Sequence, residues 1–449
     1  MSIKRSVLIV TSTYAPAMMA DTHRARLLAW EMPQAGWAVD ILAPGPEFQH
    51  PSCVEGDSDA FFSPAARVHY VAPWCAPFFR LLTVRSIGWR ALVPMAVQGL
   101  RLLRQQRFDV VYITTTQFSL FLLGPLWCWL AGTPYVLDLH DPVYKEGTER
   151  YRTSKHRLKR IFSRVLAKVI ETRTMKLASG VVSVSPHYLE ELRRRYPPLR
   201  DMWQTHGSDV VIPFGARPED LAETTRAFAH DGEVARPVLR IVYVGAGGTI
   251  MVRALRAICR ALMLVKQADD ALAARMRIEL HGTMHGWREG DERLLWQTAC
   301  QCGVGNLVEE SPARVSYRRS LELLHEASGV LVLGVDHAGY MPSKLFGYAL
   351  SGKPLLAAVH AASPARACLE SNPQLGRLLW FSDEEQMSAG DAARVMRAFL
   401  TDVADGKRFD RRAVLEPVLA RAMAARHAEF FERCLHATEP SPKTATRAA

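Results

Sequence analysis

The chain has 449 residues, which is more than one ordinary domain needs and is enough for two. Hydrophobic residues make up 49% and charged residues 22%, a composition that is typical of a folded α/β protein and excludes extensive disorder. The net charge of +11 predicts an anionic partner, and nucleic acid, a phosphorylated substrate or an acidic membrane surface would each satisfy it. The eight cysteines contain no CxxC pair, which indicates buried thiols in a reducing compartment.

The N-terminal apolar run at 6–13 is too short for the core of a signal peptide and predicts a buried first strand. The longest apolar stretch, 118–139, is broken by Gly124-Pro125 and by Gly132-Thr133-Pro134. A membrane-spanning helix needs about 20 unbroken apolar residues, so we expect a helix followed by a strand and no transmembrane segment. These features predict a cytoplasmic protein.

Two series of short apolar β-type runs alternate with helical patterns, which predicts two Rossmann-like domains with parallel sheets. We place the N-terminal domain at 1–215 and the C-terminal domain at 238–410, with a polar linker at 216–237. A C-terminal helix at 411–436 is expected to pack back toward the cleft between the domains, and 437–449 to be a disordered tail. The predicted strands are 6–13, 38–44, 67–73, 109–115, 133–141, 180–186 and 209–215 in the first domain, and 239–247, 276–283, 329–336 and 353–359 in the second.

Open parallel sheets bind their ligands beyond the carboxyl ends of the strands, so the residues after each strand are candidates for a site. A small-residue loop follows the first strand and ends in Asp21 and Thr22, either of which is a plausible helix N-cap, shortly before Arg24. The free amides of that helix N-terminus would suit a phosphate or an acceptor. The alternative is an ordinary turn between a strand and a helix.

A polar cluster closes the fifth predicted strand. Asp138 and His140 project to the same side of that strand, and Asp141 follows directly. Polar groups are costly in a buried strand unless they are paired or functional. The cluster is therefore either a functional site or a set of structural caps.

The second domain opens with a strand that leads into a glycine-rich turn containing Gly245 and Gly247, followed by a helix with Arg253. Glycines there allow the backbone to approach a phosphate closely. A dinucleotide-binding GxGxxG motif would need a glycine at Ile250, so we do not expect NAD.

The segment 340–348 places Ser343 at the start of a predicted helix and Lys344 in its first turn. A lysine there opposes the helix dipole unless an anion binds beside it. We therefore favour a diphosphate partner for Lys344 over a solvated surface position.

No metal site is predicted. The histidines His281, His285 and His337 lie in loops after different strands, without a supporting set of cysteines or carboxylates.

Several segments, taken in order, carry a family resemblance. They are VLIVTSTYAP with Arg24, TPYVLDLHDP, VVSVSPHYLEEL, VVIPFGA and PSKLFGYALSGKPLLA, and together they span roughly 5–360. The chain resembles the retaining glycosyltransferases of family 4, which have the GT-B fold of two Rossmann-like domains facing across a cleft.

The resemblance implies that a sugar is transferred from a nucleoside diphosphate donor with retention at the anomeric carbon, and that no cofactor or metal is needed. His140 or Asp141 would face the donor sugar. Gly245 and Gly247 would lie against the diphosphate, with Arg253 and Ser343 as further donor-binding residues. Lys344 would neutralise the diphosphate as it leaves, which is electrostatic catalysis.

The sequence departs from the family at two positions. The family commonly has two glutamates separated by seven residues, and this chain has Gly339 and Gly347 there. A catalytically silent paralogue that acts as a binding partner is therefore an alternative. A GT-B sugar-nucleotide epimerase is another, although it would need carboxylates to move a proton.

The expected acceptor is lipid-linked or a saccharide, in cell-envelope or exopolysaccharide biosynthesis.

Between Arg150 and Lys176 there are ten basic residues and the single acid Glu171, on a helix whose apolar residues form one face. The stretch 75–107 adds six arginines and no acid. We therefore predict peripheral attachment to the inner face of the plasma membrane through anionic lipids. Nucleic acid is disfavoured because exposed aromatic residues do not alternate with the basic ones. The apolar face of the basic helix predicted between Arg150 and Lys176 consists of Leu158, Ile161, Phe162, Val165, Leu166, Val169 and Ile170.

Overall fold

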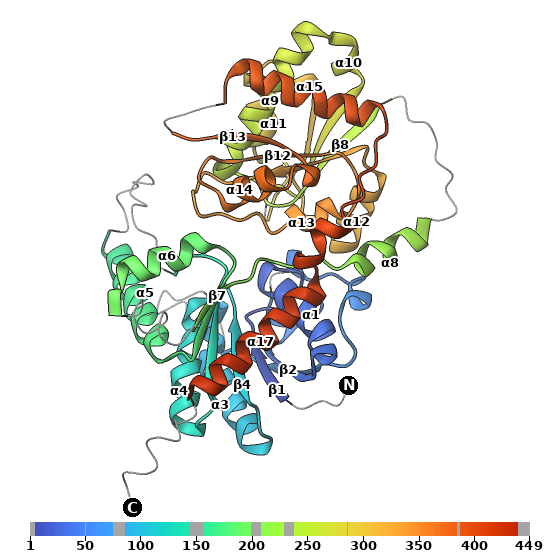
Figure 1. The fold of residues 1–449 in the computed structure, drawn as a ribbon. Coiled ribbons are helices and arrows are strands. Elements are labelled where there is room, and N and C mark those ends of the chain that lie inside the picture. Colours follow the sequence, from blue (N-terminus) through green and yellow to red (C-terminus); the bar gives the residue numbers. More distant parts are fainter. Residues whose placement is uncertain are drawn as a thin grey trace, which may run out of the picture. The chain divides into compact units, whose positions relative to one another are not determined.

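The computed structural model describes residues 5–49, 51–74, 86–143, 157–198, 208–228, 238–284, 286–383 and 387–438. The chain divides into two compact units, and each contains one parallel sheet (Figure 1). The first unit comprises 1–213 together with 420–449, and the second comprises 214–419. The chain thus leaves the first unit after its last strand and returns to it for one final helix.

The first unit has, among its described residues, a seven-stranded sheet of order β3-β2-β1-β4-β5-β6-β7, and all neighbouring strands are parallel. The central strands β4 and β5 are buried along their whole length, as expected when helices cover both faces. The strands are β1 Arg5–Val10, β2 Trp37–Pro44, β3 Arg67–Val71, β4 Val110–Thr114, β5 Tyr135–Leu139, β6 Gly180–Ser183 and β7 Asp209–Val211. The helices are α1 Ala20–Glu31, α3 Ile87–Gln105, α4 Leu123–Ala131, α5 Arg157–Leu177, α6 Pro186–Arg195 and α17 Ala420–Thr438, with short 3-10 turns such as η1 Met32–Ala35 and η5 Phe118–Leu122.

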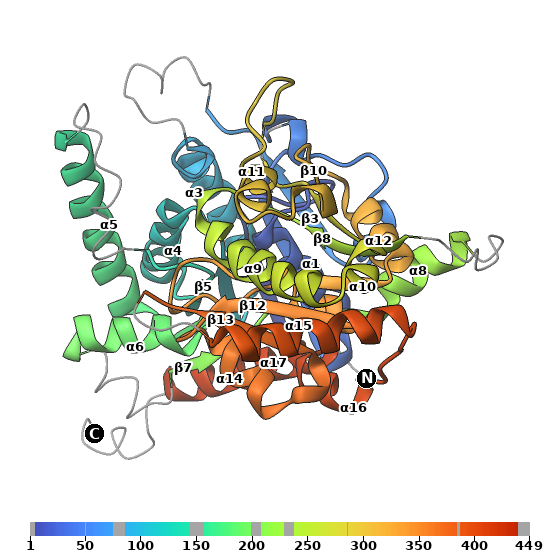
Figure 2. The same ribbon diagram turned by 90° about the horizontal axis from the view of Figure 1, so that it is seen from above.

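The second unit has a six-stranded parallel sheet of order β10-β9-β8-β11-β12-β13 in the part that the structure describes. Helices α9 and α15 pack against each other beside this sheet, which both views show (Figure 2). The strands are β8 Leu239–Val244, β9 Met276–His281, β10 Val308–Ser311, β11 Gly329–Leu333, β12 Leu355–His360 and β13 Arg377–Phe381. The helices are α8 Pro218–Phe228, α9 Val252–Ala268, α10 Asp270–Ala274, α11 Leu294–Gln301, α12 Tyr317–Glu326, α13 Leu345–Ala349, α14 Pro364–Ser371, α15 Ala389–Ala404 and α16 Arg412–Leu415, with 3-10 turns at η8 Thr249–Met251, η9 Gly305–Leu307, η10 Pro373–Leu375 and η11 Glu416–Val418.

The predicted fold class is confirmed: both units are Rossmann-like, with open parallel sheets. Each sheet reverses its strand order once, between β1 and β4 in the first unit and between β8 and β11 in the second. Such switch points leave a crevice at the carboxyl ends of the strands, which is where ligands bind in this architecture. Among the described helices, none is long and apolar enough to cross a membrane.

Four elements differ from the sequence-based expectation. The segment 216–237 was expected to be a linker, but it contains helix α8, which packs on α12 within the second unit. Strand β10 was missed because half of it is glutamate and it lies at the sheet edge. Strand β13 was also missed, at the opposite edge. The helix expected at 411–436 is broken by Pro417 into α16, η11 and α17, because proline cannot donate a helical hydrogen bond.

Helix α17 is part of the core of the first unit. It packs on α1 and η1, and the ring of Phe431 lies 5.5 Å from that of Trp37. Phe430 and Cys434 approach Gly180 of β6 so closely that a Cβ there would lie within 2.7 Å of both side chains. The first unit therefore depends on residues that lie more than 200 positions after its last strand. The expectation that this helix lies toward the cleft stays a prediction.

The buried imidazole of His427 on α17 lies between two polar groups. Its Nδ1 donates to the carbonyl of Met423 at 2.7 Å, and its Nε2 accepts from the Tyr112 hydroxyl at 3.1 Å. Burial lowers the pKa of His427 to about 3, and the charge of Arg24 contributes in the same direction, whereas Asp138 opposes it. The folded state therefore keeps this histidine neutral.

We predict that this histidine makes the fold acid-sensitive. The unfolded chain takes up a proton on His427 near its ordinary pKa, but the folded chain does not. The contribution to stability is complete above about pH 6.5 and is lost as the pH falls toward about 3, at up to about 1.4 kcal/mol per pH unit. Urea unfolding between pH 7.5 and 5 should show a steeper loss of stability in the wild type than in His427→Gln. Parallel pH profiles for the two proteins would contradict the prediction.

Candidate functional site

The loop after β8 lies at the switch point of the second sheet and is pinned by backbone hydrogen bonds. The amide of Gly245 donates to His281 O, and that of Gly247 donates to Thr283 O, both at 2.8 Å. Gly245 has a φ of +148°, which favours glycine. The sequence predicted that a phosphate approaches this turn, and in the structure the group that approaches Gly245 is a lysine side chain.

That side chain belongs to Lys344, which comes from the loop after β11 on the other side of the switch point. Its Nζ donates to the carbonyl of Val244 at 2.6 Å and lies 5.4 Å from the ring centre of Tyr243. A Cβ on Gly245 would lie 1.3 Å from this Nζ. The lysine was expected in the first turn of a helix, but α13 begins at Leu345, and Lys344 is its N-cap residue. The glycine turn and the lysine therefore form one site.

Tyr348 completes this arrangement and was not predicted as a site residue. Its hydroxyl donates to Val244 O at 2.6 Å and accepts from Val244 N at 3.0 Å. Burial raises the pKa of Tyr348, so its hydroxyl stays protonated. Its spacing of four residues from Lys344, which puts two residues on one helical face, is the signal that could have identified it.

The ammonium of Lys344 forms no ion pair with a carboxylate of the described residues. Its contacts there are the hydrogen bond to Val244 O and the aromatic ring of Tyr243. Burial lowers the pKa of Lys344 to about 8, and the charge of Arg314 contributes to this shift. The positive charge of Arg314 thus acts on the lysine, and an anion bound beside Lys344 would offset that repulsion.

Arg253 does not share this site in the structure. Its guanidinium bonds to Asp336 at 2.6 Å and to Asp383 at 2.8 Å, and also to the carbonyl of Ser382. Two carboxylates already balance its charge, so its predicted role in binding the donor lacks support from the geometry. Ser343 is exposed directly before Lys344.

The two glycines that replace the expected glutamates occupy different surroundings. A Cβ on Gly347 would meet no atom within 4 Å, so packing does not require a glycine in this helix. The amide of Gly339 donates to His337 Nδ1 at 3.2 Å. Neither position supplies an acid to the site.

In the first unit, the polar cluster at the end of β5 forms a buried network. Asp138 Oδ2 accepts hydrogen bonds from His140 Nε2 at 2.7 Å, Thr114 Oγ1 at 2.8 Å and Arg24 Nε at 3.2 Å. Burial alone would raise the pKa of the Asp138 carboxyl, but the charges of Arg24 and His140 hold it well below its usual range. Asp138 is thus an ionised centre that was noticed in the sequence but not proposed as a site residue.

The two predicted site residues that follow β5 differ in their exposure. The His140 side chain is 2% exposed, whereas Asp141 is half-buried. Of the two residues expected to face the donor sugar, Asp141 is therefore the more accessible in the first unit, whereas His140 belongs to the buried network.

Side chains of the loop after β1 form hydrogen bonds with the start of the helix that follows it. The carboxylate of Asp21 accepts from the hydroxyls of Ser12 and Thr13. Helix α1 begins at Ala20 with Met19 as its N-cap, so the prediction that Asp21 or Thr22 caps it was wrong. Arg24 is fully buried and also donates to the carbonyls of Ile212 and Pro213 at 2.7 and 2.9 Å. Its geometry assigns it to the core rather than to a phosphate.

No group of three or more potential metal ligands occurs among the described residues. His281 bonds to Glu279 at 3.1 Å, His337 accepts the Gly339 amide, and His285 lies outside the described residues.

Comparison with known proteins now adds to this geometry. Residues 22–204 match the family model described as a glycosyl transferase 4-like domain. None of the curated proteins matches the chain by sequence.

Solved structures resemble the whole chain. Sucrose-phosphate synthase from Thermosynechococcus elongatus has a TM-score of 0.59 and 14% identity, with 97% of this chain and 100% of that one covered. HepE from Anabaena, in complex with UDP and glucose, has a TM-score of 0.59 and 13% identity, covering 96% and 100%. WaaG, a glycosyltransferase involved in lipopolysaccharide biosynthesis, has a TM-score of 0.52 and 14% identity, covering 97% and 96%. At these identities the similarity shows the fold, which is GT-B.

The contact between Gly245 and Lys344 yields a testable prediction. Gly245→Ala should displace the lysine ammonium and also strain the backbone at positive φ. Gly248→Ala is the matched control, because Gly248 has a φ of +89° but a Cβ there would meet nothing within 4 Å. We expect Lys344→Ala to restore part of the stability lost in Gly245→Ala, with a coupling of about 0.5–3 kcal/mol, and to restore none in Gly248→Ala. Additive losses in urea unfolding would show that the two residues do not touch.

Proposed function

We propose that this chain, which has the GT-B fold and matches a glycosyl transferase 4-like domain model at 22–204, transfers a sugar from a nucleoside diphosphate donor to a lipid-linked or saccharide acceptor, with retention at the anomeric carbon. The observation that carries the donor assignment is the unbalanced ammonium of Lys344 at the switch point of the second sheet. HepE binds UDP and UDP-glucose, which favours the same ligand class here.

In this proposal the donor diphosphate lies beside Lys344 and the amides of the 245–248 loop. Negative charge builds up on the diphosphate as the bond to the sugar breaks, and a fixed cation stabilises that charge most in the transition state. Burial lowers the lysine pKa to about 8 in the absence of donor, and a bound diphosphate would raise it again. Donor affinity should therefore fall above about pH 8, where the empty site loses its proton.

From the first unit, we propose that Asp141 faces the donor sugar and that His140 stands behind it. The hydrogen bond from His140 Nε2 to Asp138 fixes the orientation of the imidazole. Retention can be tested by NMR from the anomeric configuration of the first product formed. Assembly of envelope or exocellular polysaccharide is the proposed setting, and the similarity to WaaG supports it.

The main test is Lys344→Ala, assayed against a panel of nucleoside diphosphate sugars. We expect turnover to fall by about 10²–10³-fold while the protein stays folded, because one charge facing the leaving group is lost. Lys353→Ala is the matched control. Its Nζ also donates to a backbone carbonyl, His325 O at 2.9 Å. Lys353 precedes β12 and so lies at the amino end of that strand, whereas Lys344 lies at the carboxyl side of the sheet. That variant should lose stability and keep its donor affinity.

The panel also tests the donor class. A matching nucleoside diphosphate at 100 times its dissociation constant should stabilise the native state by about 2.7 kcal/mol. If UDP, GDP, ADP, CDP and TDP all leave the melting midpoint of the wild type unchanged, the proposed function fails. If one of them binds but no sugar is ever transferred, the chain is a binding partner rather than an enzyme.

We further propose that transfer needs no metal, because Lys344 and backbone amides supply the positive charge that a cation would otherwise provide. Turnover should persist in excess EDTA. Loss of activity in EDTA and its return with Mg²⁺ or Mn²⁺ would contradict this.

We also propose that the first unit attaches to an anionic membrane. Helices α3, α4 and α5 pack in sequence beside one another, and their outer sides define what we term the docking surface (Figure 2). Trp129 on α4 is 81% exposed, and tryptophan is a residue that is enriched at membrane–water interfaces. The exposed apolar residues of the docking surface are Val93, Val97, Leu126, Trp129, Leu130, Val165, Val169 and Leu177.

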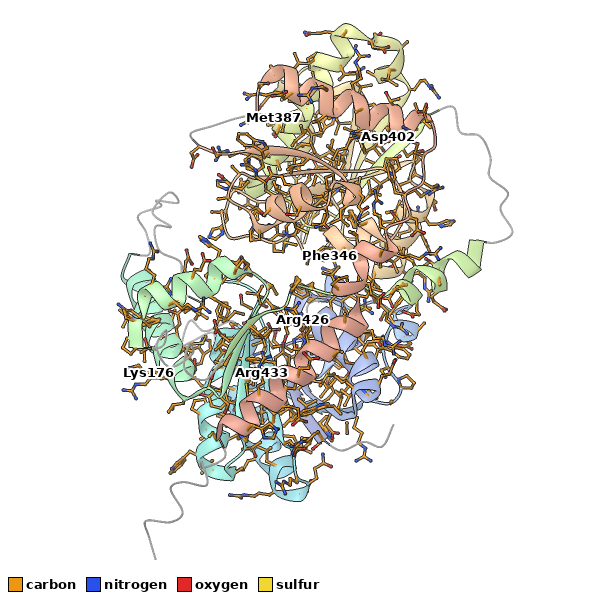
Figure 3. All side chains as sticks on the ribbon, in the orientation of Figure 1. Lys176, Phe346, Met387, Asp402, Arg426 and Arg433 are labelled. Carbon is orange, nitrogen blue, oxygen red and sulfur yellow. The ribbon has the colours of Figure 1, made fainter. Side chains whose placement is uncertain are left out.

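Exposed basic side chains lie among these apolar residues. Helix α5 presents Lys168, Arg173 and Lys176 to solvent, and Figure 3 shows Lys176 at the outer side of the unit. The single acid of this helix, Glu171, is buried and pairs with Arg195 at 2.6 Å, so it does not neutralise the surface. Each basic residue near an anionic bilayer contributes about 1 kcal/mol, and three together suffice for reversible binding.

This arrangement corrects the single apolar face expected for α5, because Val165 and Val169 are 57% and 50% exposed while Ile170 is buried. The side chains of 157–164, and residues 75–85 and 150–156, lie outside the described residues. The proposal therefore rests on the second half of the helix together with α3 and α4.

Vesicle sedimentation tests the attachment. We expect binding to vesicles of phosphatidylcholine with phosphatidylglycerol, release by high salt, and no binding to phosphatidylcholine alone. The triple change Lys168→Glu, Arg173→Glu and Lys176→Glu, and separately Trp129→Ser, should weaken binding without unfolding the protein. Arg394→Glu on α15, 75% exposed, is the control and should bind normally. Equal sedimentation of wild type and triple variant would refute the proposal.

A further inference from the structure

The second unit has a cavity that the proposed transfer reaction does not use. It lies beside α9 and has a volume of about 600 Å³, within the range of small-molecule sites. The first residues of α15, the end of β13 and Cys302 after α11 form its other walls. Apolar side chains such as Met263, Phe381 and Met387 line it, and the partly buried Met263 and Met387 pack on the core of the unit. The floor of the cavity is therefore a continuation of the hydrophobic core.

Three arginines of α9 line the cavity: Arg253, Arg256 and Arg260. Their spacing of three and four residues puts them on one helical face, one turn apart. Like charges at this spacing repel, and α9 itself carries no acid to offset them. None of the described side chains that line the cavity is acidic.

The three arginines differ in how their charges are balanced. Arg253 is held by Asp336 and Asp383 and stacks 5.5 Å from the centre of the Phe381 ring, which fixes one end of the cavity. Arg256, one turn further along, is half-buried and forms no ion pair with a carboxylate of the described residues. A partly desolvated cation without a partner is unfavourable, and an anion in the cavity would remove that cost.

We propose that this cavity binds an organic anion, with a carboxylate or phosphate group at Arg256 and Arg260 and an apolar body on the floor formed by Met263, Phe381 and Met387. The walls of the cavity suit both halves of such a molecule. A bare phosphate would leave the apolar floor exposed to water, and a neutral apolar molecule would leave the charge of Arg256 without an anion. The site is separate from the one at Lys344 and does not depend on the proposed transfer reaction.

Cys302 is a rival partner for the arginines. A hydrogen bond from Cys259 lowers the pKa of the Cys302 thiol to about 6, and the charges of Arg256 and Arg260 add to that effect. The arginines therefore act across the cavity, but a thiolate in its wall would compete with an external anion. Replacing the thiol separates these two possibilities.

The test uses the full chain in calorimetric titrations with four probes: decyl phosphate, decanoate, inorganic phosphate and decanol. We expect one molecule of decyl phosphate or decanoate to bind, and phosphate and decanol to bind at least tenfold more weakly. Vesicles containing phosphatidic acid form a fifth arm. Binding of the soluble amphiphile without binding to these vesicles identifies a free anion, and binding to both identifies a lipid as the source of the same chemistry.

Three variants place the binding in the cavity. Arg256→Gln with Arg260→Gln should weaken decyl phosphate binding by about tenfold or more, since charge-assisted hydrogen bonds are lost. Lys266→Gln on the same helix, outside the cavity, is the control and should bind as the wild type does. Ala392→Trp keeps both arginines and fills the space, so it should abolish binding.

The proposal is overturned if the double arginine variant or Ala392→Trp binds as tightly as the wild type, or if decanol binds as tightly as decyl phosphate. Cys302→Ser should retain the wild-type affinity or bind more tightly. Binding that appears only in Cys302→Ser would assign the arginines to the thiolate and would equally overturn the proposal. Folding of each variant is checked by its melting midpoint, and nucleotide binding at Lys344 should be unchanged in Ala392→Trp.

Discussion

The first unit depends on one buried ion pair, between Arg24 and Asp138, in which both side chains are fully shielded from water. A guanidinium in such a place must have all its donors satisfied, and Arg24 reaches the end of β7 and α17 as well as β5. One side chain thus joins four elements that are distant in sequence. Removing one partner of a buried pair costs about 3–5 kcal/mol, because the remaining charge stays uncompensated. Other features of this unit, including the orientation of His140, follow from that constraint.

The second unit also has cations whose charge must be balanced, and it balances two of them in different ways. Arg253 and Lys344 both stand at the carboxyl edge of the sheet, where an anion could bind, but their charges are balanced unequally. Two carboxylates hold Arg253, whereas Lys344 forms no ion pair with a carboxylate of the described residues and bonds instead to the Val244 carbonyl. Charge balance rather than position along the edge therefore distinguishes the residue suited to a ligand from the one that holds loops together.

The sequence was most informative where structure is local. Apolar runs identified the buried central strands, because parallel strands covered on both faces are apolar throughout. Glycines after β8 and the segment around Lys344 were recognised because turns and helix starts have short-range signatures. The edge strand β10 was not predicted, since two of its four residues are charged. The roles of Arg24 and Arg253 could not be predicted either, because the partners of Arg24 lie 114 to 399 residues away and those of Arg253 lie up to 130 residues away.

The return of α17 to the first unit has a consequence for how the protein is made. The second unit is continuous in sequence, so it can complete its fold as soon as residue 419 has been synthesised. The first unit begins earlier but lacks Met423, His427 and Phe431 until the ribosome has passed them. The sheet of the first unit therefore cannot complete its core until more than 200 further residues have been synthesised, and the face that α17 will cover stays exposed until then. The first unit is thus synthesised first but completes its fold last. Chaperones would bind to its exposed apolar face during synthesis.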